Sequence, residues 1–293
     1  MAKPRTLLGE VTPLKAADFR YVRPKTLEAA LSYLAGEADA MPLAGGQSLM
    51  PMMNFRLAAP ELLVDLNDLS ELDYVSASPD GWLEIGAMTR YRTLSAHPHL
   101  PCYAPLIAKA LPHVAHAAIR NRGTVGGSIA LADPAAELPA ILLALAGEVV
   151  LQGPSGERVV EADDYVLGPY MTAREDGELV TKVRIPLAKD GDRFGFCELT
   201  RRHGDYAMAG CFVAASHDFE AVRIALFGVA DRPVRSFGAE VALQGHRGDD
   251  ADLEKAVAAL TDVEMMGDVH NTADTKQHLA GVALKRAFLE ARG

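Results

Sequence analysis

The chain has 293 residues, of which 49% are hydrophobic and 23% are charged, a balance typical of globular proteins. Its formal net charge of -10 argues against a nucleic-acid partner, because nucleic-acid phosphates are bound by basic surfaces. Its three cysteines are far apart and show no Cys-x-x-Cys spacing, which excludes a disulfide framework and a self-contained four-cysteine iron–sulfur cluster. We expect a cytoplasmic protein, because the first ten residues lack the apolar core of a signal peptide and no apolar run is long enough for a transmembrane segment.

The N-terminal part predicts a β-α-β unit that ends in a glycine turn. A strand over residues 19–24 precedes a helix, which Thr26 can cap and which Gly36 can end. A strand over residues 40–44 then leads into two adjacent glycines. Residues 47–57 are helical or irregular and rich in methionine, a residue that fills irregular gaps in cores.

The middle of the chain predicts further strands and helices. They are a strand at 62–66, a hairpin of 74–76 and 83–86, a helix capped by Thr89 that runs to Leu94, a helix at 105–111, an apolar helix at 135–145, and a hairpin of 149–151 and 159–160.

The C-terminal part is richer in strands. Strands are expected at 179–185, 193–200, 207–216 and 221–229, and helices at 252–260 and 275–290. Strands followed by helices suggest a separate α+β domain, and a boundary is expected between residues 168 and 177. We therefore expect three units: residues 1–58, 59–177 and 178–293.

Two glycine-rich segments, residues 42–51 and 122–137, carry the functional signal. Each has adjacent glycines beside a small hydroxyl residue. Adjacent glycines permit positive φ and close approach of a ligand to the backbone. Successive backbone N–H groups in such turns can hold anionic oxygens, and Ser48 and Thr124 add hydroxyl donors. Together the segments predict a site for one extended diphosphate.

Other common nucleotide-binding and hydrolase motifs have no match in the sequence. It contains no G-x-G-x-x-G after a strand, no P-loop and no G-x-S-x-G nucleophile turn. His113 and His116 lie three apart, but without a third ligand a solvated or hydrogen-bonded pair is expected rather than a metal site.

Residues 44–57, 119–130, 132–137 and 201–209 resemble the FAD-binding medium subunit of molybdenum hydroxylases, the carbon monoxide dehydrogenase and xanthine dehydrogenase family. The resemblance runs from Phe19 to the C-terminal helix. It implies an α+β chain with the vanillyl-alcohol-oxidase-type (PCMH) FAD-binding fold. Two α/β subdomains would hold FAD, and a C-terminal α+β domain would cover the flavin.

The resemblance also implies site residues. Asp133 and Glu137 would lie near the ribityl and ring portions of FAD, and Tyr206 would cover one flavin face. Glu198 stands near a position that is often basic in relatives, so no cationic flavin contact is expected there. The first diphosphate loop would comprise Leu43, Ala44, Gly45, Gly46, Gln47, Ser48 and Leu49, and the second Gly123, Thr124, Gly126, Gly127, Ser128 and Ala130.

In this family the medium subunit does not transform the organic substrate, so no catalytic residue and no metal ligand is expected in this chain. The resemblance implies an oxidoreductase complex with a large molybdenum-cofactor subunit and a small 2Fe-2S subunit, arranged as a dimer of heterotrimers. Electrons would pass from the 2Fe-2S clusters through FAD to an external acceptor. Two other possibilities stay open: a stand-alone flavoenzyme on the same fold, and a scaffold protein that has lost FAD.

Overall fold

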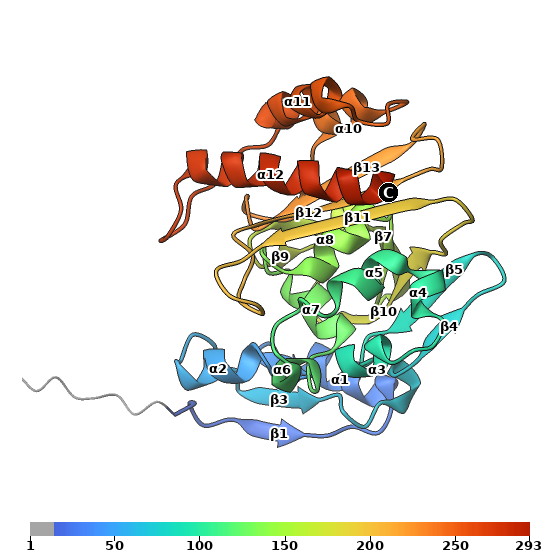
Figure 1. Cartoon of the computed structure of the whole chain (residues 1–293). Coiled ribbons are helices and arrows are strands. Elements are labelled where there is room, and N and C mark those ends of the chain that lie inside the picture. The colour runs from blue at the N-terminus through green and yellow to red at the C-terminus, as the bar shows by residue number, and fades with distance from the viewer. Residues whose placement is uncertain (1–14) are drawn as a thin grey trace, which may run out of the picture.

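A computed structural model describes residues 15–293 and arranges them in three stacked parts (Figure 1). The first subdomain lies at one end, the second subdomain in the middle, and the C-terminal domain at the other end. The first ten residues, for which we expected no signal peptide, lie outside the described residues, and so does the start of the expected 1–58 subdomain. Among residues 15–293, none of the helices combines the length and apolarity that a membrane span requires.

The first subdomain is a small parallel sheet with strand order β1-β3-β2. As expected, Thr26 caps the first helix, since its Oγ1 accepts a hydrogen bond of 3.2 Å from the Ala29 backbone N–H. The strands expected at 19–24, 40–44 and 62–66 are present, but the last, expected in the 59–177 unit, pairs with both other strands of this sheet, so the boundary does not fall at residue 58. The elements are β1 (Arg20–Val22), α1 (Leu27–Gly36), β2 (Ala40–Leu43), α2 (Leu49–Asn54), β3 (Leu62–Asp65) and the short 3-10 helix η1 (Ser70–Leu72).

The second subdomain combines an antiparallel sheet of order β4-β5-β10-β6-β7 with short helices. Its strands are β4 (Val75–Ala77), β5 (Trp82–Gly86), β6 (Glu148–Gly153), β7 (Gly156–Glu161) and β10 (Leu179–Pro186). Its helices are α3 (Tyr91–Ser95), α4 (Leu100–Tyr103), α5 (Pro105–Ala110), α6 (Ala117–Arg120), α7 (Val125–Leu131), α8 (Glu137–Ala144) and α9 (Ala162–Tyr165). A two-stranded ribbon of β8 (Val166–Gly168) and β9 (Met171–Thr172) follows α9.

The position of β10 moves the boundary between the last two units. The sequence predicts a strand at 179–185 that starts the C-terminal domain. The strand is present, but it pairs with β5 on one side and β6 on the other. The sheets therefore divide after Pro186 and not at residue 177.

Two local expectations near the second glycine segment are also corrected. Thr89 does not cap α3, because Arg90 occupies the cap position and the Thr89 hydroxyl donates to the Tyr74 carbonyl at 2.9 Å. The expected glycine loop is helical from Val125 to Leu131, and Thr124 caps this helix by accepting a 3.1 Å hydrogen bond from the Gly127 N–H.

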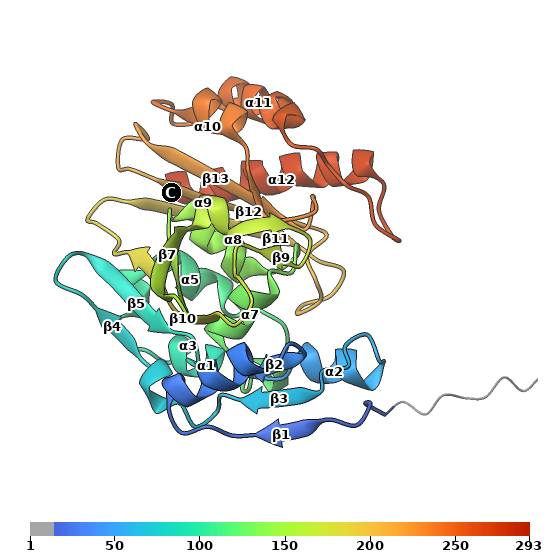
Figure 2. The same cartoon turned by 180° about the vertical axis from the view of Figure 1, so that it is seen from behind.

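The C-terminal domain has an antiparallel sheet of order β11-β12-β13-β14, which α12 crosses in both views (Figures 1 and 2). The helices α10 and α11 lie at the end far from the first subdomain. The elements are β11 (Arg193–Leu199), β12 (Ala209–Ala215), β13 (Val222–Phe227), β14 (Val234–Arg235), α10 (Phe237–Leu243), α11 (Asp250–Ala259), the 3-10 helix η2 (Leu260–Asp262) and α12 (Ala273–Arg292).

The two faces of the C-terminal sheet belong to different cores. On one face Phe196, Phe212 and Phe227 stack in a row, with ring centroids 4.8 and 5.1 Å apart, and pack with the helices of the second subdomain. On the other face apolar residues pack beneath α10, α11 and α12. The sheet thus shares one continuous core with the second subdomain.

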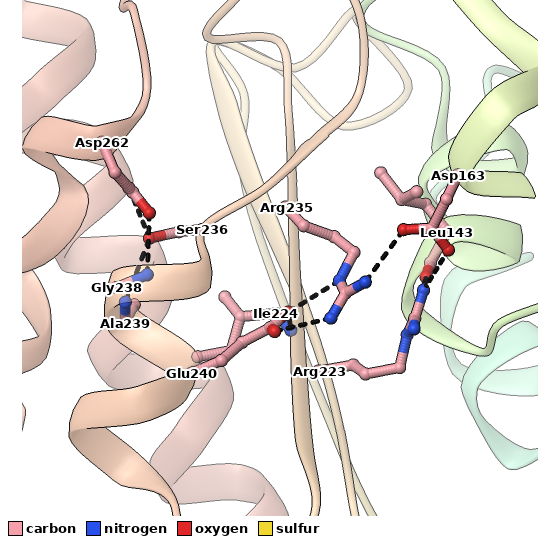
Figure 3. Close-up of polar contacts among 10 residues, drawn as sticks. All are labelled: Leu143, Asp163, Arg223, Ile224, Arg235, Ser236, Gly238, Ala239, Glu240 and Asp262. Atoms are coloured by element: carbon pink, nitrogen blue, oxygen red, sulfur yellow. Dashed lines mark hydrogen bonds and ion pairs between the residues drawn. The ribbon is translucent and has the colours of Figure 1, made fainter.

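A polar network also joins these two parts, as Figure 3 shows. Arg223 and Arg235 of the C-terminal sheet both donate to the Asp163 carboxylate in α9, at 2.6 and 2.9 Å. Arg223 also donates to the carbonyl of Leu143 in α8, at 2.8 Å. Glu240 in α10 accepts two hydrogen bonds from Arg235, at 2.6 and 2.8 Å. Asp163 therefore holds two strands of the C-terminal sheet against the second subdomain.

Candidate cofactor-binding site

A cavity of about 400 Å³ lies where the two subdomains meet. Its walls come from the end of β2 and the loop that follows it, from α7 and the start of α8, and from the loop between β11 and β12. All three parts of the fold therefore contribute to one cavity.

Every expected site residue except Leu43 lines this cavity. Leu43 lies at the end of β2, where its carbonyl accepts a 3.0 Å hydrogen bond from the Leu66 N–H and so supports the first loop. The lining residues among those expected are Ala44, Gly45, Gly46, Gln47, Ser48, Leu49, Gly123, Thr124, Gly126, Gly127, Ser128, Ala130, Asp133, Glu137 and Tyr206.

The first loop presents unused backbone donors at the cavity. The backbone N–H groups of residues 45–48 donate no hydrogen bond to another described residue. Gly46 has a φ of +71°, and the Gly45 carbonyl is occupied by the Gln47 side chain at 3.1 Å. Consecutive free N–H groups in such a turn form a concave site for anionic oxygens. This donor set fits a diphosphate.

The second loop is built differently. Its amides are used inside the protein: Val125 N–H donates to Thr89, Gly126 N–H to Ala87 and Gly127 N–H to Thr124, at 2.8–3.1 Å. A Cβ on Gly126 would lie 2.4 Å from the Ala87 Cβ, so this glycine is required by packing. The expectation that both loops offer free backbone donors holds for the first loop only.

The two loops approach each other backbone to backbone. A Cβ on Gly45 would lie 2.4 Å from the Arg122 carbonyl oxygen and 2.9 Å from the Gly123 Cα. Arg120 does not line the cavity, and it donates to the carbonyls of Val114 and Ala115, at 2.8 and 2.6 Å. The contact between the loops therefore leaves no room for a side chain.

Two acidic residues, Asp133 and Glu137, also line the cavity, and the pKa values of both carboxyl groups are raised. Burial raises the pKa of Glu137 to about 7, and burial also raises the pKa of Asp133. Tyr170 donates to the Asp133 carboxylate at 3.3 Å. A raised pKa shifts a carboxyl group toward its neutral form and so weakens its repulsion of an anionic cofactor.

Glu198 does not line the cavity, but it interacts electrostatically with Glu137, which does; the sequence identified it only as a departure from relatives. Its side chain is 1% exposed, and its Oε2 has no hydrogen-bond partner among the described residues. Burial, assisted by the charge of Glu137, raises its pKa to about 8. The nearest basic group is His113, whose Nδ1 lies 3.7 Å from Oε2. Alternation along β11 with the inward-facing Phe194 and Phe196 could have predicted this burial.

Tyr206 lies at the mouth of the cavity, in the loop between β11 and β12. It is 72% exposed and lies outside both strands, so it is not a core tyrosine. Gly204 in the same loop has a φ of +83°. An exposed aromatic ring beside a cavity is available to a planar ligand.

Two family models cover nearly the whole chain. The model described as "FAD binding domain in molybdopterin dehydrogenase" matches residues 17–188, and the model described as "CO dehydrogenase flavoprotein C-terminal domain" matches residues 194–291. The gap between them falls just after β10, where the sheets also divide.

Individual relatives agree with the family models. The glyceraldehyde dehydrogenase medium chain of Sulfolobus acidocaldarius is 36% identical and aligns over 93% of this chain and 98% of its own length. The nicotine 6-hydroxylase medium subunit of Paenarthrobacter nicotinovorans is also 36% identical, over 95% and 99%.

A solved structure shows the same fold. A chain of the reconstituted CO dehydrogenase from Oligotropha carboxidovorans superposes with a TM-score of 0.91 at 37% identity, over 94% of this chain and 98% of that chain. The expected PCMH-type fold with mixed helices and sheets is thereby confirmed. This chain belongs to the FAD-binding medium chains of the CO dehydrogenase and xanthine dehydrogenase family, and so it is a flavoprotein subunit of a molybdenum-containing oxidoreductase.

Proposed function

We propose that this subunit takes electrons from the 2Fe-2S clusters of a small partner subunit and passes them to an external acceptor. When bound, FAD supplies the one- and two-electron chemistry that such a transfer needs. Oxidation of the organic substrate would take place on a large molybdenum-cofactor subunit. A dimer of heterotrimers in the cytoplasm is part of this proposal, and the three free thiols of the chain are compatible with a reducing compartment.

One observation carries the proposal. Relatives that align with this chain over more than nine-tenths of its length bear the names of different substrates: glyceraldehyde, nicotine and carbon monoxide. A subunit of one family that occurs with different substrates is better suited to a shared step than to substrate recognition. Electron transfer through FAD is such a shared step.

We further propose which part of FAD each group of cavity residues binds. The free N–H groups of residues 45–48 would bind the diphosphate. Thr124 and Ser128 would face it from the second loop. Asp133 and Glu137 would lie toward the ribityl and ring portions, and Tyr206 would cover one face of the flavin.

The test is purification of the native complex. We expect two further chains, with molybdenum, iron and flavin in the same preparation. Under anaerobic conditions the organic substrate should bleach the flavin absorbance of the complex, and adding NAD, a quinone or oxygen in turn identifies the acceptor. If the purified single chain oxidises the organic substrate by itself, the proposal is wrong and the chain is a stand-alone flavoenzyme.

A further inference from the structure

Arg90 is a half-buried arginine that the proposed function does not use. It stands at the start of α3, in the second subdomain, and it does not line the cavity. Its guanidinium donates from Nη1 to the carbonyl of Arg122 and from Nη2 to Oδ1 of Asn67. Both acceptors are neutral oxygens, so a requirement for ion pairing does not explain its position.

The two acceptors belong to different subdomains. Arg122 immediately precedes Gly123 of the second glycine loop. Asn67 follows β3 of the first subdomain. The guanidinium therefore spans the boundary across which the two loops face each other. A planar guanidinium suits this task, because its donors diverge in fixed directions.

Asn67 continues the connection to the first glycine loop. Its Nδ2 donates to the Ala44 carbonyl at 3.0 Å. Asp65 fixes the orientation of the Asn67 side chain. The Asp65 Oδ1 accepts one hydrogen bond from the Asn67 side chain and another, of 2.9 Å, from the Asn67 backbone N–H. Asp65 is itself held by the Tyr21 hydroxyl. The chain of contacts thus ends on the backbone of each loop.

The two anchored carbonyls flank the point of closest approach. Ala44 directly precedes Gly45, and the Arg122 carbonyl is the atom that a Cβ on Gly45 would meet at 2.4 Å. Since glycine backbones meet there, no side chains interlock across the contact. The separation of the loops therefore depends also on groups that bind their backbones, and the Arg90–Asn67 pair binds both.

We propose that Arg90 and Asn67 act as positioning residues that fix the distance between the two glycine loops and thereby set the affinity for FAD. The pair lies behind the cavity wall and acts through the loop backbones. The proposal rests on the binding of FAD in this cavity and is independent of the route by which electrons leave it.

The first test measures the FAD dissociation constant of the full chain after removal and re-addition of the cofactor. Arg90→Lys keeps the charge and loses the divergent donors. We expect its dissociation constant to rise about tenfold, the effect of losing one charge-assisted hydrogen bond. Arg90→Gln and Asn67→Ala should raise it by a similar factor. Arg92→Gln is the matched control, because Arg92 is exposed on the same helix.

The second test is the coupling between the two residues. Arg90 and Asn67 form one connection, so their effects should not multiply. The FAD dissociation constant of the Arg90→Gln/Asn67→Ala double variant should be at most about twice that of the single variant with the lower affinity. Each substitution should lower the melting temperature of the FAD-bound chain by more than it lowers that of the FAD-free chain. A purely structural role would lower both melting temperatures equally and leave the dissociation constant unchanged.

Three results would overturn the proposal. They are an unchanged dissociation constant in Arg90→Lys and Asn67→Ala, losses that multiply in the double variant, and an effect of the same size in Arg92→Gln. If Arg90→Gln does not fold, Arg90→Lys combined with Asn67→Ala supplies the same comparison. Failure of the unmodified chain to rebind FAD would instead count against the FAD site itself.

Discussion

Gly46 has a φ of +71°, a backbone conformation that residues with a Cβ rarely adopt. Its neighbours leave limited space, with side-chain atoms of Met50 and Leu43 at 3.2 and 3.3 Å from the position of a Cβ. We expect Gly46→Ala to stay folded and to bind FAD about tenfold more weakly, since about 1–2 kcal/mol of backbone strain would distort the loop. Isothermal titration with FAD measures this change.

Gly81 provides the matched control for Gly46. It has a φ of +89° in the turn between β4 and β5, with no atom within 4 Å of a Cβ position. Gly81→Ala therefore introduces similar backbone strain outside the cavity and should leave FAD affinity unchanged. Equal FAD affinities for the two variants would show that the first loop does not bind the cofactor.

Glu198 predicts a pH dependence of stability. The ordinary pKa of a glutamate is 4.5, whereas burial and the charge of Glu137 raise it to about 8 in the folded chain. Between these two values the unfolded chain has released a proton that the folded chain still holds. The stability contributed by this group is therefore fully present below pH 4.5 and is lost as pH rises to about 8.

Glu198→Gln should remove that loss. Between about pH 5 and pH 8, the free energy of unfolding of the FAD-free variant should fall by at least about 1.4 kcal/mol less than that of the unmodified FAD-free chain. This difference is the equivalent of one pKa unit. Urea unfolding at several pH values measures it. The exposed Glu157 is the control, because Glu157→Gln should reproduce the wild-type slope. A wild-type slope in Glu198→Gln would mean that Glu198 is ionised in the folded chain.

The glycine segments predicted a diphosphate site, and the family resemblance implied site residues of which all but Leu43 line the cavity, whereas other lining residues such as Ala87 and Leu179 were not predicted. What the sequence could not supply was the reason for each glycine. Gly46 is required by its φ, Gly45 by the opposing loop and Gly126 by Ala87. The last two depend on contacts between segments distant in the chain, which no local pattern encodes.

Among the elements, α12 contains a buried lysine, and the helical pattern of the sequence does not predict this burial. Lys276 has a side-chain exposure of 4%, and its Nζ donates to the carbonyls of Met208 and Gly228, at 2.7 and 2.6 Å. It also pairs with Asp268 at 2.7 Å. Met208 ends the loop that contains Tyr206, so α12 anchors the segment at the cavity mouth.

Lys276→Met should therefore destabilise the chain by about 3–5 kcal/mol, because two buried carbonyls and a carboxylate lose their shared donor. Chemical unfolding of the FAD-free chain provides the value. Lys285 on the same helix pairs with Glu254 at the surface, and Lys285→Met should cost less than about 1 kcal/mol. Similar costs for the two variants would contradict a special role for Lys276.

Two elements show where prediction from sequence fails. Residues 125–131 contain two glycines, which disfavour a helix. They are helical because Thr124 caps the segment and because Val125 and Ile129 are fully buried. The strand β10 was predicted correctly, but its neighbours β5 and β6 are distant in sequence, and strand pairing of this kind cannot be derived from local periodicity.

At the scale of the whole molecule, the C-terminal domain is attached by an apolar core and by the Asp163 network of Figure 3. Asp163→Ala removes the acceptor shared by Arg223 and Arg235, at the partly exposed edge of the contact. We expect a loss of about 1–2 kcal/mol and a broader thermal transition in calorimetry, because the C-terminal domain then unfolds less cooperatively with the rest.

The control for this variant is Asp218→Ala, since Asp218 makes only local contacts in the turn between β12 and β13. It should retain the sharp transition of the unmodified chain. If Asp163→Ala also keeps a sharp transition at an unchanged temperature, the apolar core alone couples the two parts.

The central place of β10 has a consequence for how the flavoprotein is made. The ribosome completes both glycine loops long before residues 179–186, yet β10 is the strand between β5 and β6, and Leu179 and Val180 form part of the cavity wall. A nascent chain that stops short of β10 has both loops but no finished sheet beneath them. We therefore expect a chain that ends before β10 to bind FAD weakly or not at all, so that it would be colourless.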